Sequence, residues 1–407
     1  MSQVSKPLDS DTTTVLSLKW DIFCKVVDNF GDIGVCWRLC CDLATRGHRV
    51  RLWLDDASAL AWMAPAGCAN VELVDCSQGL PQAARSTMGD VLVDTFGCEF
   101  AINLIAAKLI NTTTTAQNDT QNRPVWLNLE YLTAESFAER NHTLPYTHHA
   151  GPAAGWMQRY FYPGFNARTG GLLRETDLPQ RQAVFEKVAW LNQVSQVNKL
   201  GFTTHADDAT QFISLFCYEP AALEALIDQL AAHPQPTRLL VTHSRAAVAV
   251  KTVLEHKKQH QPAYLLPEQL SISYLPALTQ RDYDHLLWAC DLNFVRGEDS
   301  LVRAIWADKP FIWQIYPQAD GAHHAKLDAF LTMMDAPASL KAAHGAWNAA
   351  TPASSSHDHG VPGWPELDLP LWTQSAQNLS RKLRQQDDLV ANLVAFIALC
   401  SEKQLKS

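Results

Sequence analysis

Two aspartates stand close together in the segment 28–34, which separates a short apolar run from a helical pattern. Asp28 and Asp32 place two carboxylates within five residues, an arrangement that can hold a cation and accept a proton. Gly31 and Gly34 are the glycines of this segment, so it lacks the G-x-G-x-x-G dinucleotide fingerprint and is no P-loop. The plainer alternative is that Asp32 caps the helix and Asp28 starts a turn.

A second segment whose side chains could bind or react with a ligand is 296–300, Arg-Gly-Glu-Asp-Ser, which directly follows an apolar run. A helix is predicted to begin with the residue after it. Backbone N–H groups at a helix N-terminus, aided by Arg296 and Ser300, form a site for a pyrophosphate without a metal ion. The plainer alternative makes Asp299 or Ser300 the N-cap and Glu298 an exposed loop residue, which is compatible with phosphate binding.

Three aromatic residues end predicted strands in the second half of the chain, namely Phe216, Tyr218 and Tyr316. Aromatic rings in such places can stack on a nucleobase or pack against a sugar. Each of them alone also fits ordinary core packing.

The elements that must position these residues alternate between short apolar runs and helical patterns, which predicts parallel sheets covered on both faces. The pattern occurs twice, so the predicted fold is α/β with two Rossmann-like doubly wound domains. A closing helix from about Leu371 to Cys400 is expected to cross back onto the first domain. The expected parts are a leader at 1–17, an N-terminal domain at 18–190 completed by 380–407, and a C-terminal domain at 205–370, with the boundary between about 185 and 210.

The composition narrows the class of protein. The 407 residues include 33 Lys and Arg against 42 Asp and Glu, a net charge of -9, which argues against nucleic acid or an anionic membrane as a partner. Ten cysteines without a C-x-x-C pair predict buried reduced thiols rather than disulfides or a zinc site. The polar start has no secretory signal, and no apolar run approaches the ~20 residues that span a bilayer, so a cytoplasmic location is predicted.

At the two polar segments the chain resembles the protein-arginine rhamnosyltransferases that modify bacterial elongation factor P, the EarP family. The resemblance spans nearly the whole chain. Its most specific stretches are Asp28-Asn-Phe-Gly-Asp-Ile-Gly-Val-Cys-Trp-Arg38 and Asp291-Leu-Asn-Phe-Val-Arg-Gly-Glu-Asp-Ser300, extended by Arg303-Ala-x-Trp306 and Pro310-Phe-x-Trp313-x-x-Tyr316-Pro-Gln318.

The resemblance implies a GT-B fold whose domains face a central cleft. The C-terminal domain would bind TDP-β-L-rhamnose, the N-terminal domain would face elongation factor P, and the anomeric configuration would be inverted. No metal or other cofactor is implied. The implied catalytic residues are Asp28, Asp32 and Glu298, and the implied donor contacts are Asn29, Phe30, Gly31, Phe216, Tyr218, Arg296, Asp299, Ser300, Tyr316 and Gln318.

Two features depart from the family's pattern. Family members usually have an aromatic residue after the Leu-Pro of Leu275-Pro276, where this chain has Ala277, so base stacking is not expected from this position. The insertions 111–122 and 349–363 have no family counterpart, and we assign them no role.

The chemistry of an arginine acceptor explains why carboxylates are needed at the site. A guanidinium is protonated near neutral pH and is a poor nucleophile, so a base must take a proton from it. We hypothesise that Asp32 is the general base and that Asp28 orients the guanidinium or supports Asp32. TDP would leave toward Arg296 and Ser300, while Glu298 holds the donor or organises the pocket.

Three alternatives remain open at this point. A glycosyltransferase with a small-molecule acceptor is the nearest one, since a fold does not determine its acceptor. A nucleotide-dependent oxidoreductase or epimerase is disfavoured by the missing dinucleotide fingerprint. A non-catalytic adaptor on a translation factor would not need the paired acids.

Overall fold

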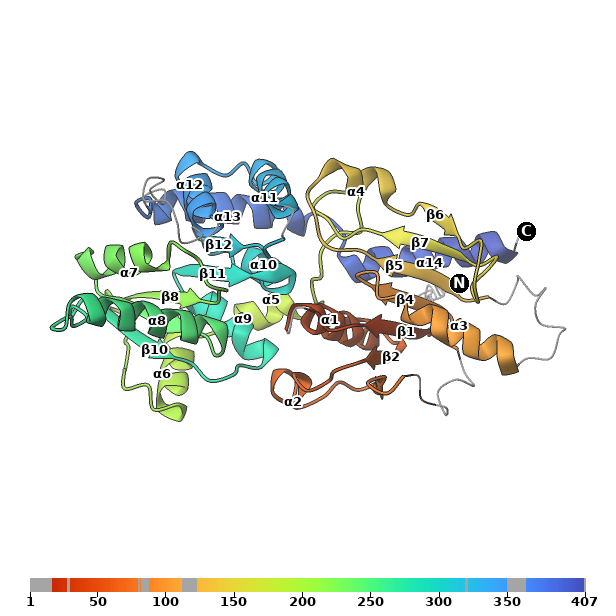
Figure 1. Ribbon diagram of the computed structural model, residues 1–407, viewed down its shortest axis with the longest axis horizontal. Helices are drawn as coiled ribbons and strands as arrows, with labels where there is room; N and C mark the ends of the chain where they lie inside the picture. The colour runs from red at the N-terminus through yellow and green to blue at the C-terminus, as the bar shows by residue number, and fades with distance from the viewer. Residues whose placement is uncertain are drawn as a thin grey trace, which may run out of the picture.

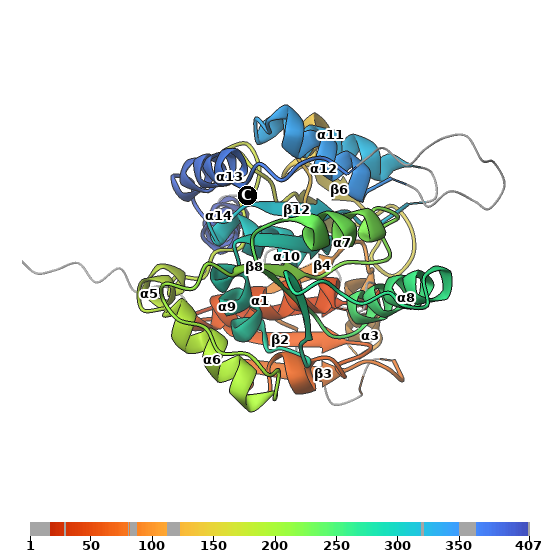
Figure 2. The same ribbon diagram turned by 90° about the vertical axis from the view of Figure 1, so that its left-hand side faces the viewer.

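The computed structural model forms two α/β domains that lie side by side (Figure 1), and Figure 2 views the molecule with the second domain toward the reader. Asp28 and Asn29 lie outside the residues that the structure describes, as do 1–16 of the predicted leader and most of both predicted insertions. The described residues are 17–27, 30–79, 81, 88–111, 123–318, 321–349 and 364–405.

The first domain is built on a seven-stranded sheet with the order β3-β2-β1-β4-β5-β7-β6. Its neighbouring strands are parallel except at one edge, where β6 runs antiparallel to β7. Every residue of β4 and β5 is buried, as expected for strands with helices on both faces. The strands are β1 (Lys19–Cys24), β2 (Arg49–Leu54), β3 (Val71–Asp75), β4 (Val91–Thr95), β5 (Val125–Leu129), β6 (Pro145–Thr147) and β7 (Met157–Phe161).

The second domain holds a five-stranded parallel sheet with the order β10-β9-β8-β11-β12. In both sheets the chain moves outward strand by strand and then returns to the other side of its first strand. Ligands bind at such switch points, outside the carboxyl ends of the strands. The two polar segments of the sequence follow β1 and β11, which flank these points. The strands are β8 (Gln211–Leu215), β9 (Thr237–Val241), β10 (Leu270–Tyr274), β11 (Leu292–Arg296) and β12 (Phe311–Gln314).

Helix α10 begins at Gly297, earlier than the predicted start at Leu301. Gly297 has a φ of +67°, a conformation that glycine adopts without strain and that turns the chain directly from β11 into the helix. Glu298, Asp299 and Ser300 therefore lie in the first turn of α10. The helices are α1 (Gly31–Thr45), α2 (Leu60–Met63), α3 (Phe100–Asn111), α4 (Ser136–Asn141), α5 (Leu178–Ala183), α6 (Lys187–Val197), α7 (Leu223–Ala232), α8 (Arg245–His260), α9 (Gln280–Ala289), α10 (Gly297–Trp306), α11 (Ala322–Met333), α12 (Ala338–Trp347), α13 (Leu369–Arg384) and α14 (Leu389–Leu405).

The closing segment is two helices, so the single predicted helix from Leu371 to Cys400 is wrong. Trp372 of α13 is buried in the core of the second domain, whereas Leu393 of α14 is buried in the core of the first. Asp388 stands at the break between them, and its side chain accepts a hydrogen bond from the N–H of Ala391 in the first turn of α14. The break between α13 and α14 lets each helix pack into the core of a different domain.

Helix α6 belongs to the second domain. Trp190 and Leu191 pack with Phe212 and Leu286 in a small core beside the second sheet. The second domain therefore takes in residues from before the expected start at 205, and the crossover between the domains precedes α6.

The ten cysteines are free thiols. Within the described part of the chain, no helix combines the length and apolarity needed to cross a bilayer. In that same part, no group of three or more His, Cys, Asp or Glu side chains is arranged to hold a metal ion.

Candidate active site

The first turns of α1 and α10 face each other across the boundary between the domains. Gly34 of α1 permits their close approach, since a Cβ at this position would lie 3.2 Å from Asp299 Oδ2. Gln280 of α9 adds a hydrogen bond across the boundary, its Nε2 donating to the carbonyl oxygen of Gly34 at 3.0 Å. Gly31 borders two cavities at this boundary. The two polar segments of the sequence therefore meet at one place.

The first cavity lies at the carboxyl edge of the second sheet. Phe216 follows β8, Thr242 follows β9 and Ala277 follows β10, and all three line it. The first domain contributes Phe30 and Trp62, whose rings meet edge to face with centroids 5.1 Å apart. A wall of aromatic and aliphatic side chains with a few polar groups suits a flat heterocycle.

Arg296 is the last residue of β11 and the N-cap of α10. Its guanidinium lies between two rings, 4.5 Å from the centroid of Phe216 and 4.4 Å from that of Tyr218. Only 4% of the residue is exposed. Arg296 also lines the first cavity, so a charge held on two aromatic faces is presented to that space.

The start of α10 has the properties of an anion site. The first N–H groups of any helix have no partner within it, and the helix dipole adds positive potential there. Ser300 holds the turn in place, because its Oγ donates to the carbonyl oxygen of Arg296 and accepts from the N–H of Arg296 at 3.1 Å. Trp313 Nε1 donates to the carbonyl oxygen of Gly297 at 2.8 Å, which fixes the preceding bend.

Asp299 borders the first cavity, but its carboxylate is engaged at the domain boundary. Its Oδ1 lies 3.1 Å from Nε of Arg38 on α1. Burial raises the pKa of Asp299, and Arg38 opposes that shift.

The second cavity is rich in carboxylates. Asp32, Glu130 and Glu135 border it from the first domain, and Glu298 borders it from the second, with Lys326 as a cation on its wall. Three acids on one side give this cavity a negative field, which favours a cationic group such as a guanidinium.

Asp32 is the second residue of α1 and only 5% exposed. Its Oδ2 accepts a hydrogen bond from the N–H of Val27 at 2.9 Å, which ties it to the loop after β1. Asp32 borders the second cavity. Asp28 and Asn29, the other predicted polar residues of this loop, lie outside the described residues.

Glu298 joins the two domains. Its Oε2 accepts from the N–H of Leu132 at 2.8 Å, and its Oε1 accepts from Nζ of Lys326 at 2.6 Å. Both oxygens therefore hold partners, which favours an organising role over proton transfer.

Two of the three aromatic residues predicted at strand ends line a cavity. Phe216 lines the first cavity, while Tyr316 and Gln318 line the second. Tyr218 is buried and is not part of the wall of either cavity. Its ring meets Tyr316 edge to face with centroids 5.7 Å apart and lies against the guanidinium of Arg296.

Sequence reasoning missed several residues at the site, Glu130 and Trp62 among them. Glu130 directly follows β5, the same position relative to a strand that led us to the loop after β1, so this signal was available. Its Oε1 accepts from Nδ2 of Asn128 at 2.5 Å, and burial raises the pKa of its carboxyl. Trp62 lies on the four-residue helix α2, and no pattern in the sequence connects it with a cavity in the other half of the chain.

Comparisons with known proteins agree with one another. A family model described as elongation factor P (EF-P) rhamnosyltransferase EarP matches residues 20–398. A protein-arginine rhamnosyltransferase of Pseudomonas aeruginosa is 38% identical over 395 residues, covering 93% of this chain and 98% of that protein. One from Pseudomonas putida is 36% identical over 389 residues, with the same coverage of 93% and 98%. A solved structure described as the structural basis for EarP-mediated arginine glycosylation of translation elongation factor EF-P matches with a TM-score of 0.58 and 28% identity, covering 93% of this chain and 98% of that chain.

Proposed function

Because the chain belongs to the EarP family of elongation factor P rhamnosyltransferases, we propose that it transfers L-rhamnose from TDP-β-L-rhamnose to an arginine of translation elongation factor P, with inversion. It is a protein-arginine rhamnosyltransferase with a GT-B fold. This decides against the oxidoreductase and adaptor alternatives. The proposal rests most on the meeting of an anion-binding helix start with an acid-lined cavity at the domain boundary.

The donor is proposed to bind along both cavities. The thymine ring enters the first cavity, whose walls include Phe216 and Trp62. The diphosphate lies over the first turn of α10, where N–H groups and Arg296 offset its charge. The sugar then reaches the second cavity beside Tyr316. Because these groups supply the positive potential, the proposed mechanism uses no metal ion or other cofactor.

The acceptor guanidinium is proposed to enter the second cavity from the side of the first domain. Glu130 and Asp32 can bind its N–H groups, and the flat ring of Tyr131 on the same wall can pack against its face. Because the proposed acceptor is a translation factor, the enzyme is proposed to act in the cytoplasm.

The transfer step forms one bond and breaks another at the anomeric carbon. A guanidinium nitrogen attacks from the face opposite the diphosphate, and the bond from the sugar carbon to the diphosphate oxygen breaks. TDP leaves with the bonding electrons toward Arg296 and the start of α10, which stabilise the developing charge. Asp32 takes a proton from the attacking nitrogen, so the glycosylated product remains a guanidinium cation.

The proposal is tested by incubating the purified protein with TDP-rhamnose and unmodified elongation factor P and recording the intact mass of the acceptor. A gain of one deoxyhexose is expected, and it should be absent when the acceptor arginine is replaced by lysine. If the mass stays unchanged while TDP-rhamnose binds, the acceptor assignment is wrong, and a small-molecule acceptor becomes the better account.

A further inference from the structure

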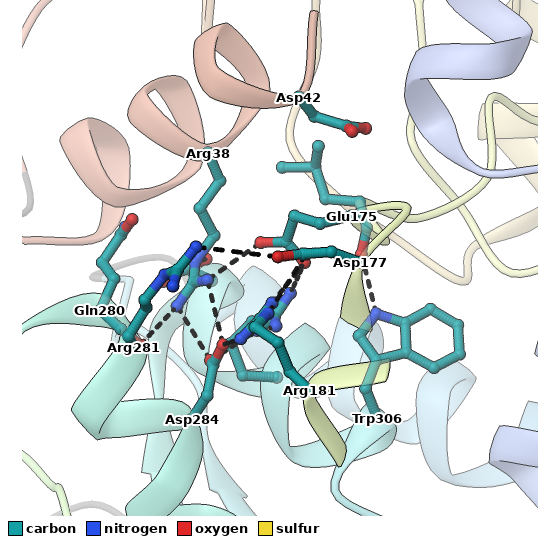
Figure 3. Close-up of polar contacts among 12 residues, drawn as sticks. Arg38, Asp42, Glu175, Asp177, Arg181, Gln280, Arg281, Asp284 and Trp306 are labelled. Carbon is teal, nitrogen blue, oxygen red and sulfur yellow. Dashed lines mark hydrogen bonds and ion pairs between the residues drawn. The ribbon is translucent and has the colours of Figure 1, made fainter. Parts of the chain in front are cut away.

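Arg38 lies on the second turn of α1, and only 5% of its side chain is exposed. It extends out of the first domain toward Asp284 and Glu175 (Figure 3). Nη2 lies 3.1 Å from Asp284 Oδ1, Nη1 lies 3.0 Å from Glu175 Oε1, and Nε lies 3.1 Å from Asp299 Oδ1. Its Nη2 also donates to the carbonyl oxygen of Gln280 at 3.3 Å. One guanidinium of α1 thereby engages α9, α10 and the segment before α5.

The carboxylates that Arg38 meets are shared with two further arginines. Asp284 Oδ2 lies 2.8 Å from Nη2 of Arg303 and 3.0 Å from Nη1 of Arg181. Although burial opposes the shift, Arg303 and Arg38 lower the pKa of Asp284 well below its usual range and that of Glu175 to about 2. Both carboxylates are therefore charged at neutral pH and keep Arg38 in place.

The position of Arg38 relates it to both halves of the site. It follows Asp32 by six residues on the same helix, a separation of about 9 Å along the axis. Its partner Asp299 belongs to the first turn of α10, next to Ser300 and close to Arg296. Gly34, which lies between Asp32 and Arg38 on α1, packs against Asp299, so α1 and α10 are in contact at this position.

We propose that Arg38 is a positioning residue, which holds the acid-bearing turn of α1 at the correct distance from the anion-binding turn of α10 through its ion pair with Asp299. The inference rests on the proposed function for its meaning, since it concerns the alignment of base and leaving group. Arg38 acts through Asp299 and the α9 carboxylate rather than by proton transfer. Misplacement of reacting groups by about 1 Å can lower a rate by about 10²-fold.

Loss of any buried partner in this cluster also lowers stability, because it leaves a charge unpaired. A matched control must therefore remove an arginine without disturbing the contact between α1 and α10. Arg181 serves this purpose, since it binds Asp284 and Glu175 but lies on α5. Arg181→Met removes a similar charge from the cluster and leaves the pair of Arg38 and Asp299 in place.

The experiment compares Arg38→Met, Arg38→Lys and Arg181→Met for thermal unfolding, TDP affinity by calorimetry, and kcat and KM for elongation factor P. We expect R38M to lower kcat by about 10²-fold while its TDP affinity stays within about threefold. R38K should recover part of kcat. R181M should lose a comparable amount of thermal stability but keep kcat within about threefold. Equal kcat losses in R38M and R181M would overturn the proposal, as would normal kcat in R38M.

A double variant keeps the proposal testable if R38M folds poorly. R38M combined with Asp299→Asn removes the orphaned charge but does not restore the ion pair, so kcat should stay low, and recovery of kcat would refute the proposal. Small-angle scattering of the nucleotide-free protein gives a readout that needs no transfer activity. R38M should increase the maximum dimension and R181M should not. An inactive wild type would refute the proposed function, and the scattering comparison would still decide the role of Arg38.

Discussion

Glu298 of α10 accepts a hydrogen bond from the backbone N–H of Leu132, 2.8 Å away in the opposite domain. The same carboxylate binds Lys326 at 2.6 Å. Glu298, one of the three implied catalytic acids, therefore links the two domains at the wall of the second cavity. Because both oxygens of Glu298 hold partners, we assign it an organising role, whereas Asp32 is proposed as the general base.

Glu298→Gln should lower kcat by about tenfold, because the amide can still accept from Leu132 but no longer neutralises Lys326. Glu298→Ala should lower it further. Lys326→Met is the matched variant and should reproduce much of the E298Q effect, as measured by initial rates of transfer. A severe loss in E298Q together with a harmless K326M would instead assign Glu298 to the chemical step.

Asp32→Asn should lower kcat by about 10²- to 10⁴-fold, the usual contribution of a general base. TDP affinity should stay close to the wild-type value, because Asp32 borders the second cavity, whereas the diphosphate is proposed to lie over the first turn of α10. Calorimetry with TDP and single-turnover rates measure the two effects separately. Near-normal turnover in D32N would remove Asp32 from the role of base.

Arg296→Met should weaken TDP binding by about 10- to 100-fold, since hydrogen bonds to charged groups contribute about 1.5–3 kcal/mol. Arg296→Lys should not restore it fully, because lysine lacks the flat group held between Phe216 and Tyr218. Arg245→Met is the control, because Arg245 also packs on Tyr218 but pairs with the exposed Glu219. Titration with TDP at two salt concentrations measures these affinities, and equal losses in R245M and R296M would contradict the assignment.

Trp62→Ala should weaken TDP binding by about 5- to 100-fold if Trp62 contacts the thymine ring, since stacking of a base on an aromatic side chain contributes about 1–3 kcal/mol. Ala277→Phe in the same protein should restore part of the affinity, because position 277 lies on the same cavity. Fluorescence titration with TDP checks both variants. Unchanged affinity in W62A would place the base elsewhere.

The buried His344 makes stability depend on pH. Burial lowers the pKa of His344 to about 4 from the ordinary 6.5, and its Nε2 accepts from the N–H of Trp313 at 3.1 Å. The unfolded chain therefore binds one more proton between these pH values, so the free energy of unfolding should fall as the pH drops from 6.5 toward 4, by about 1.4 kcal/mol per pH unit. His142 shifts in the same direction and adds to the wild-type slope. Denaturant unfolding of His344→Gln should give a shallower slope, and an unchanged slope would contradict this assignment.

The overall fold was predictable because strands buried on both faces leave short apolar runs, as at 91–93 of β4 and 125–127 of β5. Other features depend on contacts between distant parts of the chain. From the sequence, Gly297 was interpreted as part of a loop. In the structure its left-handed conformation joins β11 to α10 without an intervening loop. The break before α14 arises because Trp372 and Leu393 belong to different cores, and local helical pattern carries no information about that.

Part of the candidate site could be located in the same way. Asp32 and Arg296 follow strands that flank the switch points, so topology alone brings them to the cleft. Glu130 follows β5 at the same carboxyl edge of the first sheet, although β5 does not flank the switch point. Trp62 and Arg38 could not be assigned in advance, because their surroundings are formed by the opposite domain.

The most direct test of the central claim is the nuclear magnetic resonance spectrum of the acceptor peptide after reaction with TDP-β-L-rhamnose. We predict one rhamnose linked to a guanidinium nitrogen of arginine in the α configuration, which is the result of direct displacement by an acceptor in the second cavity. A sugar on any other side chain, or a β linkage at arginine, would contradict the proposed meeting of base, acceptor and leaving group between α1 and α10.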